Sequence, residues 1–371
     1  MTAAGHRPPE ADERAGAPAP GARPRTGTRR RRRAVLGTAA LAAAVAAAVV
    51  PASEARHGGT GAHEASGTAH AASARPAGAR AAAPAQDFRP GAPEPEKCAD
   101  GKSPDASLRA DGGSGKTVRA IKKRGKLVVG VDQNSYLWGF RDPTDGSIQG
   151  FDIDLVKAIA RDILGDDGPD KITYKTIPTN KRFEAIEHRD VDMVVRAVTI
   201  TCERKRDVAF STAYFEAGQQ LLAPEDSDVK GFDSSMNGRR ICYASGSMAE
   251  TMMTSDRFRA LGAKPVVVPN QLDCLVRLQL GEADAVVTDN ALAAGQAAQD
   301  PSVELVGTPQ TVEPYGVAMH PDADDLVRRV NKVLEDYRKD GWRESYKEWL
   351  ADNMDTKDGK EPAPPKARYS D

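Results

Sequence analysis

The sequence predicts an α/β protein with two lobes, a parallel sheet in each lobe and a two-strand hinge between them. Short apolar runs typical of buried strands alternate with amphipathic segments typical of helices, which indicates right-handed βαβ units. This pattern restarts after residue 215. Asp192 and Asp284 occupy matching places in the two halves, and each precedes an apolar strand with a Val-Val pair in the same register. The repetition predicts two related lobes.

The first lobe opens with a short helix at 118–123 that ends before Gly125, a residue suited to a helix C-terminus. Its longest helix is expected at 152–164, where four aliphatic residues share one face and Gly165 follows. A further helix is expected at 182–188, and strands at 126–131, 171–177 and 193–195.

The second lobe repeats this order, with strands expected at 239–244, 265–268 and 283–288 and helices at 247–261, 272–280 and 290–299. A strand at 315–319 then returns to the first lobe, where amphipathic helices are expected at 324–339 and 341–350. The chain therefore crosses between the lobes twice, near 212–218 and 308–314.

The beginning of the chain has the composition of a targeting segment. Residues 1–33 carry nine Arg and a net charge of +6, whereas the 371 residues together carry −1. An Ala-rich apolar run at 34–50 and small residues follow, so residues 1–55 are expected to be a secretory signal peptide. The consecutive arginines also permit twin-arginine export. An uncleaved membrane anchor is the alternative, and a lipid anchor is not expected because the first Cys after the apolar run is Cys98.

Composition also sets the expected boundaries of the lobes. Residues 56–104 are rich in Ala, Gly, Pro and His, with almost no large apolar side chains, which predicts a disordered linker. A polar tail at 355–371 is expected to be disordered as well. Lobe 1 then comprises 105–214 and 308–354, and lobe 2 comprises 215–307.

The charge balance and the cysteines narrow the possible functions. The residues after 33 are net acidic, which gives no support for nucleic-acid binding, and no metal or other cofactor is expected. An exported chain with four cysteines is expected to form two disulfides, Cys242–Cys274 within lobe 2 and Cys98–Cys202 between the linker and lobe 1. A nucleophilic Cys is the alternative, but the folded part contains only two histidines to activate it.

Polar residues follow matching strands in the two halves. Arg196, Thr199 and Arg204 come after the strand at 193–195, and ligands of open α/β sheets lie outside the carboxyl ends of the strands. A guanidinium there suits a carboxylate, although an exposed charge-rich loop is the alternative. Asp289 follows the matching strand of lobe 2, where it suits a ligand ammonium group or, alternatively, caps the next helix.

Three segments resemble known sequence motifs. Gly-Phe-Asp-Ile-Asp-Leu and the eight residues after it (150–163) match the signature of family 3 periplasmic solute-binding proteins. Thr-Ile-Thr-Cys-Glu-Arg (199–204) resembles their carboxylate-binding segment, and 208–214 resembles their first hinge strand. The resemblance extends from about residue 125 to 350 and implies the two-lobed, periplasmic-binding-protein-like (type II) fold.

The resemblance also implies roles for individual residues. Arg204 corresponds to the arginine that holds the α-carboxylate of an amino acid, with Thr199, the backbone of Ala197 and Ser247 beside it. Asp289 corresponds to the acceptor of the α-ammonium group.

The side chain of the ligand would meet other residues of lobe 1. Asp132 matches a position that contacts this side chain in some relatives. Arg196 and Arg182 are candidates to bind a side-chain carboxylate, although a surface ion pair is an equal alternative for Arg182. Thr179 replaces a stacking aromatic of many relatives, and Tyr136 or Trp138 is expected to supply the aromatic wall instead.

The resemblance therefore implies an extracytoplasmic, monomeric protein that binds a free amino acid. Glutamate or glutamine is expected first, with aspartate and asparagine as further candidates. The bound ligand would be delivered to the membrane permease of an ABC transporter or, alternatively, reported to a membrane sensor protein. The competing class is a periplasmic dehydratase-like enzyme on the same fold, but no enzymatic activity is expected.

Overall fold

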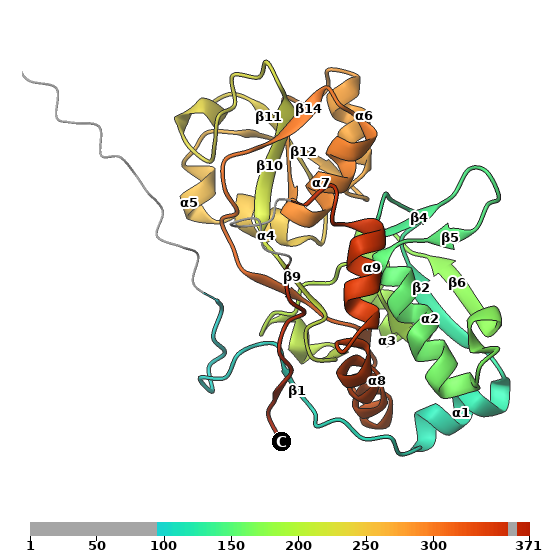
Figure 1. Cartoon of the computed structure of the whole chain (residues 1–371). Coiled ribbons are helices and arrows are strands. Elements are labelled where there is room, and N and C mark those ends of the chain that lie inside the picture. The colour runs from blue at the N-terminus through green and yellow to red at the C-terminus, as the bar shows by residue number, and fades with distance from the viewer. Residues whose placement is uncertain (1–94, 355–361) are drawn as a thin grey trace, which may run out of the picture. The chain divides into compact units, whose positions relative to one another are not determined.

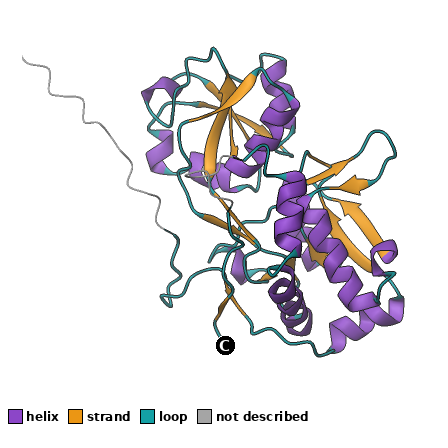
Figure 2. Ribbon diagram, in the orientation of Figure 1, coloured by secondary structure: helices purple, strands orange, loops and turns teal. Residues whose placement is uncertain are grey.

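The computed structural model describes residues 95–354 and 362–371, which form two α/β lobes (Figure 1). In each lobe the strands are flanked by helices (Figure 2). The expected signal peptide and most of the expected linker lie outside the described residues. No helix in the described part of the chain is long and apolar enough to cross a membrane.

The sheet of lobe 1 has the strand order β6-β2-β7-β16-β8. Its strands β2, β6 and β7 are parallel, whereas β16 runs antiparallel to β7 and β8. The bounds are β2 (Leu127–Val131), β6 (Ile172–Thr176), β7 (Met193–Val194), β8 (Ala209–Phe210) and β16 (Ala318–Met319). A small second sheet contains β3 (Asn134–Ser135), β4 (Gly139–Arg141) and β5 (Ile148–Gln149).

The sheet of lobe 2 has the order β12-β11-β13-β10-β14. Here β11 is parallel to β12 and β13, and β10 is antiparallel to β13 and β14. The bounds are β10 (Gln219–Pro224), β11 (Arg240–Ala244), β12 (Lys264–Val268), β13 (Ala285–Asp289) and β14 (Val303–Val306).

Both sheets are therefore mixed, and the prediction of a parallel sheet holds only for three strands of each. The two crossings explain the difference. The parallel strand β13 ends at Asp289, and β10 begins beside it at Gln219, directly after the first crossing. A strand that enters a sheet from the end where its neighbours leave must run antiparallel to them.

Two antiparallel hinge strands connect the lobes, as the sequence predicts. β9 (Phe215–Ala217) pairs with β15 (Glu313–Tyr315), so that Phe215 lies opposite Tyr315 and Ala217 opposite Glu313.

Each sheet has a buried core on both faces, because successive strand residues point to opposite sides. In β7, Met193 packs into the core beneath the long helices of lobe 1, while Val194 packs into the core on the opposite face. Leu221 and Leu222 of β10 divide in the same way between the two cores of lobe 2.

The helices agree with the expected order, with one correction. Lobe 1 contains α1 (Lys116–Arg124), α2 (Phe151–Leu164), α3 (Arg182–Glu187), α8 (Asp324–Tyr337) and α9 (Gly341–Trp349). Lobe 2 contains α4 (Met248–Met253), α5 (Asp256–Arg259), α6 (Asp273–Gln279) and α7 (Asn290–Gln299). The single helix expected at 247–261 is thus two. The hydroxyls of Thr254 and Ser255 donate to the carbonyls of Glu250 and Met252 at the break, and such local bonds compete with the helix.

The prediction of a disordered tail at 355–371 is wrong for residues 362–371. There β17 (Arg368–Tyr369) pairs in parallel with β1 (Ala106–Ser107). The side chain of Asp371 accepts a hydrogen bond from the Arg109 amide at 2.6 Å and pairs with Arg328 at 2.6 Å. The polar composition of this segment concealed its partners, which are charged residues of lobe 1.

Candidate functional site

A cavity of about 30 Å³ lies between the lobes, at the ends of β2, β7 and β13. Its lining includes seven of the nine residues predicted to bind the ligand: Asp132, Trp138, Arg196, Ala197, Thr199, Ser247 and Asp289. Arg204 and Tyr136 do not line it. The remaining lining residues are Ser135, Asp152, Thr179, Arg182, Ala244, Met248, Ala249, Gln271, Val287, Thr288 and Leu292.

The loop after β7 is fixed by a buried carboxyl group at the start of α2. Asp152 accepts a hydrogen bond of 2.9 Å from the amide of Ala197 and one of 2.7 Å from the hydroxyl of Tyr214. Ala197 has a φ of 45°, which is uncommon for a residue with a side chain. Burial raises the pKa of Asp152 to about 7, while the two hydrogen bonds oppose this shift.

Arg196 and Asp132 form a buried ion pair in the cavity, with 2.7 Å between Nη2 and Oδ2. Arg196 also donates to Thr179 Oγ1 at 2.9 Å and to Asn270 Oδ1 of lobe 2 at 3.2 Å. The Asp132 carboxylate accepts two further bonds from backbone amides and one from the Ser135 hydroxyl. Arg196 and Asp132 are both predicted to contact the side chain of the ligand, and each is thus already paired with the other. The pair presents no net charge to a ligand.

Arg182 is a buried cation without an acidic partner among the described residues. Only 4% of its surface is exposed, so the surface ion pair considered for it does not form. Its Nη2 donates to the backbone carbonyl of Gly246 in lobe 2 at 3.0 Å, and its Nε has no hydrogen-bond partner. Burial and the neighbouring charges of Arg204 and Arg196 lower the pKa of Arg182 well below its usual value.

Arg204 lies outside the cavity lining, half-buried beside the same carbonyl group. Its guanidinium donates to Gly246 O at 3.2 Å and to Thr199 O at 2.9 Å. The Gly246 carbonyl oxygen therefore accepts hydrogen bonds from two arginines of the other lobe.

Asp289 lies at the end of β13, close to the hinge. Its carboxylate accepts hydrogen bonds from Gln219 Nε2 and the Tyr315 hydroxyl, and burial raises its pKa. It makes no side-chain bond to the start of α7, which disfavours the helix-capping alternative. Gln219 Nε2 also donates at 3.0 Å to Glu313 of the second hinge strand. Burial, followed by the charge of Asp289, raises the pKa of Glu313 to about 7.

Ser247 caps the start of α4, next to where the sequence predicts a helix to begin. Its hydroxyl accepts a hydrogen bond from the Glu250 amide at 3.2 Å and donates to Ala244 O at 2.6 Å. Both capacities of the hydroxyl are thus used within lobe 2.

Of the two candidate aromatic walls, Trp138 lines the cavity and Tyr136 does not. Trp138 is buried, and its Nε1 donates to Ala291 O of lobe 2 at 3.0 Å. The ring of Tyr136 instead packs on Phe140, with 5.0 Å between the ring centroids.

Sequence reasoning missed Gln219, Glu313 and Tyr315 around Asp289. All three lie on or next to the strands at the two crossings between the lobes. Glutamine and glutamate in otherwise apolar crossing segments are the signal that points to them. Asn270 and Gln271 follow β12 in the same way that Asp289 ends β13.

Both predicted disulfides are formed. Cys242 pairs with Cys274 inside lobe 2, and Cys98 pairs with Cys202, which directly follows Thr201 in the loop after β7. No group of side chains suited to a metal ion is found among the described residues.

Comparison with known proteins agrees with this architecture. A model of the bacterial extracellular solute-binding proteins, family 3, matches residues 127–352. The ABC transporter glutamine-binding protein GlnH of Bacillus subtilis is 37% identical over 238 residues, which is 64% of this chain and 85% of that protein. The glutamine-binding protein of Geobacillus stearothermophilus is 37% identical over 201 residues, 54% of this chain and 75% of that protein.

A solved structure shares both fold and sequence features with the chain. An ancestral arginine-binding protein bound to glutamine is 34% identical, with a TM-score of 0.56, and the match covers 61% of this chain and 98% of that one. The family match covers more than half of the chain and includes both lobes and the cavity between them. The chain belongs to the bacterial extracellular solute-binding proteins, family 3.

Proposed function

We propose that the chain binds a free amino acid outside the cytoplasm, glutamine first and glutamate second, and delivers it to the permease of an ABC transporter. One observation carries this proposal: a buried carboxylate of lobe 2, Asp289, and a buried guanidinium of lobe 1, Arg182, line the same cavity without bonding to each other. The carboxylate is bound by Gln219 and Tyr315, and the guanidinium by the Gly246 carbonyl. The two ends of a zwitterionic amino acid complement these charges.

The α-carboxylate is assigned to Arg204 and Arg182. Their guanidinium groups converge on the carbonyl oxygen of Gly246, so an oxygen acceptor is already favoured at this point. A ligand carboxylate offers two acceptors in one plane and a full negative charge, which makes stronger hydrogen bonds than a carbonyl. Thr199, the loop at Ala197 and the start of α4 at Ser247 complete this end of the site.

The α-ammonium group is assigned to Asp289. Burial disfavours the ionised form of this carboxylate. A ligand ammonium group has three donors and a positive charge, so it would stabilise that form. Tyr315 and Gln219 already orient the carboxylate through hydrogen bonds.

The buried pair of Arg196 and Asp132 supports an amide as the side chain of the ligand. The pair is neutral as a whole, yet it offers both donors and acceptors, and an amide has both kinds of group. A side-chain carboxylate would place an additional charge near Asp132. The glutamine-binding relatives of 37% identity support the same choice.

Delivery to a transporter is supported by the name of the Bacillus relative, an ABC transporter glutamine-binding protein. Uptake of labelled glutamine by cells with and without this chain tests the role. Uptake that is unchanged while a membrane signalling response is lost would favour the sensor alternative.

We do not propose a dehydratase. The cavity carboxyl best suited to act as a general acid is Asp152, whose pKa is near 7. Both of its oxygens accept hydrogen bonds from lobe 1, one from Ala197 and one from Tyr214.

A thermal-shift screen over the twenty amino acids, followed by calorimetric titration, tests the proposal. A ligand at 100 times its Kd stabilises the protein by about 2.7 kcal/mol. Removing one partner of a buried charge pair costs roughly 2–5 kcal/mol, so Arg204→Ala or Asp289→Ala should weaken binding by about 30-fold to several thousand-fold. Asp166→Asn, an exposed change in lobe 1, is the control and should bind as the parent does. A parent protein that responds to no amino acid would contradict the proposal.

A further inference from the structure

The two disulfides lie in different environments. Cys242 and Cys274 are completely buried between β11 and α6 in the core of lobe 2. Cys98 and Cys202 are only partly buried and line a surface groove of about 600 Å³ in lobe 1. A thiolate from solution can therefore reach Cys98–Cys202 but not Cys242–Cys274.

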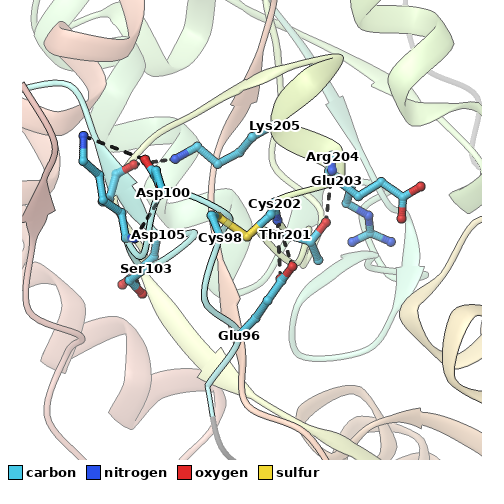
Figure 3. Close-up of a disulfide and its surroundings, with 12 residues drawn as sticks. Glu96, Cys98, Asp100, Ser103, Asp105, Thr201, Cys202, Glu203, Arg204 and Lys205 are labelled. Carbon is cyan, nitrogen blue, oxygen red and sulfur yellow. Dashed lines mark hydrogen bonds and ion pairs between the residues drawn. A yellow bond between two sulfur atoms is a disulfide. The ribbon is translucent and has the colours of Figure 1, made fainter.

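The Cys98 side of this bond is held by few other contacts. The residues before and after Cys98 are exposed, and the local turn is closed by hydrogen bonds between Cys98 and Lys102 and between Gly101 and Cys98. Glu96 accepts a hydrogen bond of 3.3 Å from the amide of Cys202 (Figure 3). The disulfide is the covalent link between this segment and the loop after β7.

The Cys202 side of the bond belongs to the loop that also lines the ligand cavity. The loop at 197–204 begins with Ala197 and Thr199, which line the cavity, and ends with Arg204. Cys202 lies two residues before Arg204, and the side chains of Arg204 and Lys205 extend to opposite sides of the disulfide (Figure 3). A change at Cys202 therefore acts directly on the backbone that presents the assigned carboxylate ligands.

We propose that Cys98–Cys202 is a thiol–disulfide exchange site for a dithiol reductant, and that its reduction loosens the loop at 197–204 and weakens ligand binding. The statement about affinity rests on the proposed function, whereas the exchange site and the loosening of the loop do not.

The exchange is balanced as a two-electron transfer. A thiolate of the dithiol attacks the sulfur of Cys98, the Cys98–Cys202 bond breaks, and Cys202 leaves as a thiolate. The second thiol of the reductant then attacks the reductant's first sulfur, which is bonded to Cys98 in the mixed disulfide, and releases Cys98. The reductant becomes a disulfide, and both cysteines take up protons as thiols.

Residues 197–200 stay anchored without the disulfide, through the bonds of the Ala197 amide to Asp152 and of the Ile200 amide to Pro314 O. Reduction releases the Cys202 end of the loop, which the ligand must then order, and this should weaken binding. Ordering the backbone of even one additional residue on binding has a cost comparable to a tenfold change in affinity, which is about 1.4 kcal/mol. We therefore expect the Kd for glutamine to rise about tenfold on selective reduction.

The test uses the full-length oxidised protein and graded concentrations of dithiothreitol. Alkylation and mass spectrometry should find Cys98 and Cys202 modified while Cys242 and Cys274 remain paired, which provides an internal control. Hydrogen exchange should increase in peptides covering 197–206 and stay constant in β11 and β13. Calorimetric titration with L-glutamine and L-glutamate should give the weaker affinity, and reoxidation should restore it.

The double variant Cys98→Ser/Cys202→Ser provides a second route that needs no reductant and should reproduce the reduced state. Simultaneous reduction of both disulfides, or unchanged exchange at 197–206, overturns the proposal. Equal affinity in the oxidised and reduced forms overturns the link to binding while leaving the proposed function in place. If the oxidised protein binds neither amino acid, the proposed function fails, and the alkylation and hydrogen exchange still decide whether the site exists.

Discussion

The guanidinium of Arg182 in lobe 1 donates a hydrogen bond of 3.0 Å to the carbonyl oxygen of Gly246 in lobe 2. Gly246 has a φ of +71°, and a Cβ added to it would lie 3.1 Å from the Cα of Asn180 in lobe 1. The turn between β11 and α4 thus meets lobe 1 through backbone atoms. Close approach of the lobes at this point depends on the absence of a side chain.

We expect Gly246→Ala to weaken ligand binding by hindering this approach. The matched control is Gly281→Ala in the same lobe, where φ is +67° and no atom lies within 4 Å of the added Cβ. Both variants should lose about 1–2 kcal/mol of stability because a side chain is unfavourable in the left-handed region. Only Gly246→Ala should also raise the Kd for glutamine, measured by calorimetry. Equal affinities of the two variants would show that the contact with Asn180 does not limit closure.

Arg182→Ala should weaken the binding of all amino acids that the parent binds, by about 30-fold or more, because the ligand carboxylate loses a buried cationic partner. Arg182→Lys should recover only part of the loss, since an ammonium lacks the planar fork of donors. Arg189→Ala is the control, because Arg189 forms an exposed ion pair with Asp322. Calorimetric titration with glutamine, glutamate and asparagine measures the three variants. A loss confined to glutamate would instead assign Arg182 to the side chain of the ligand.

Much of the fold follows from local patterns in the sequence. The apolar strands, the long helix α2 and the Cys242–Cys274 pair are all recognisable from periodicity, helix stops and cysteine position. Matching strand ends also locate Arg196 and Asp289 in one cavity, because the carboxyl ends of parallel strands mark the ligand-binding edge of a sheet. These features depend on residues close together in the chain or on a repeated pattern.

The features that were missed depend on contacts between distant residues. The antiparallel direction of β10 and β16 is set by the way the chain enters each lobe, and no local pattern encodes it. The pairing of β17 with β1 joins residues 106–107 to 368–369. The burial of Arg182 and its bond to Gly246 depend on contact between the lobes, and Arg182 alone resembles an ordinary charged residue of an exposed helix.

Replacing both cysteines of the buried disulfide, as Cys242→Ala/Cys274→Ala, should lower the free energy of unfolding by roughly 4 kcal/mol. The bond spans 32 residues, and the chain-entropy relation gives about this value for a loop of that length. Urea denaturation followed by circular dichroism measures the change. The corresponding substitution at Cys98 and Cys202 is the comparison, and only the lobe 2 variant should also leave an underpacked core, because its cysteines are fully buried. A loss below 1 kcal/mol for Cys242→Ala/Cys274→Ala would contradict the expected contribution.

The carboxyl group of Glu313 should make stability depend on pH. Burial and the charge of Asp289 raise its pKa from 4.5 to about 7 in the folded protein. Between these two values the folded protein holds a proton that the unfolded chain has released, so the free energy of unfolding should fall as the pH rises through this window. The contribution of this one group amounts to at most about 3 kcal/mol. Glu313→Gln keeps an uncharged side chain of similar shape and should flatten the dependence.

Asp152, whose pKa is also raised to about 7, should leave a remaining slope of the same sign in the Glu313→Gln variant. Glu304→Gln, on the exposed side of β14, is the control and should follow the parent protein. Urea unfolding at pH 4.5, 5.5, 6.5 and 7.5 gives the four values needed for each protein. The opposite result would be a free energy of unfolding that increases from pH 4.5 to 7.5 in the parent but not in Glu313→Gln. It would mean that Glu313 is ionised in the folded protein and stabilised by its neighbours. In that case the hydrogen bonds from Gln219, Thr199 and Thr311 would outweigh the cost of burying its charge.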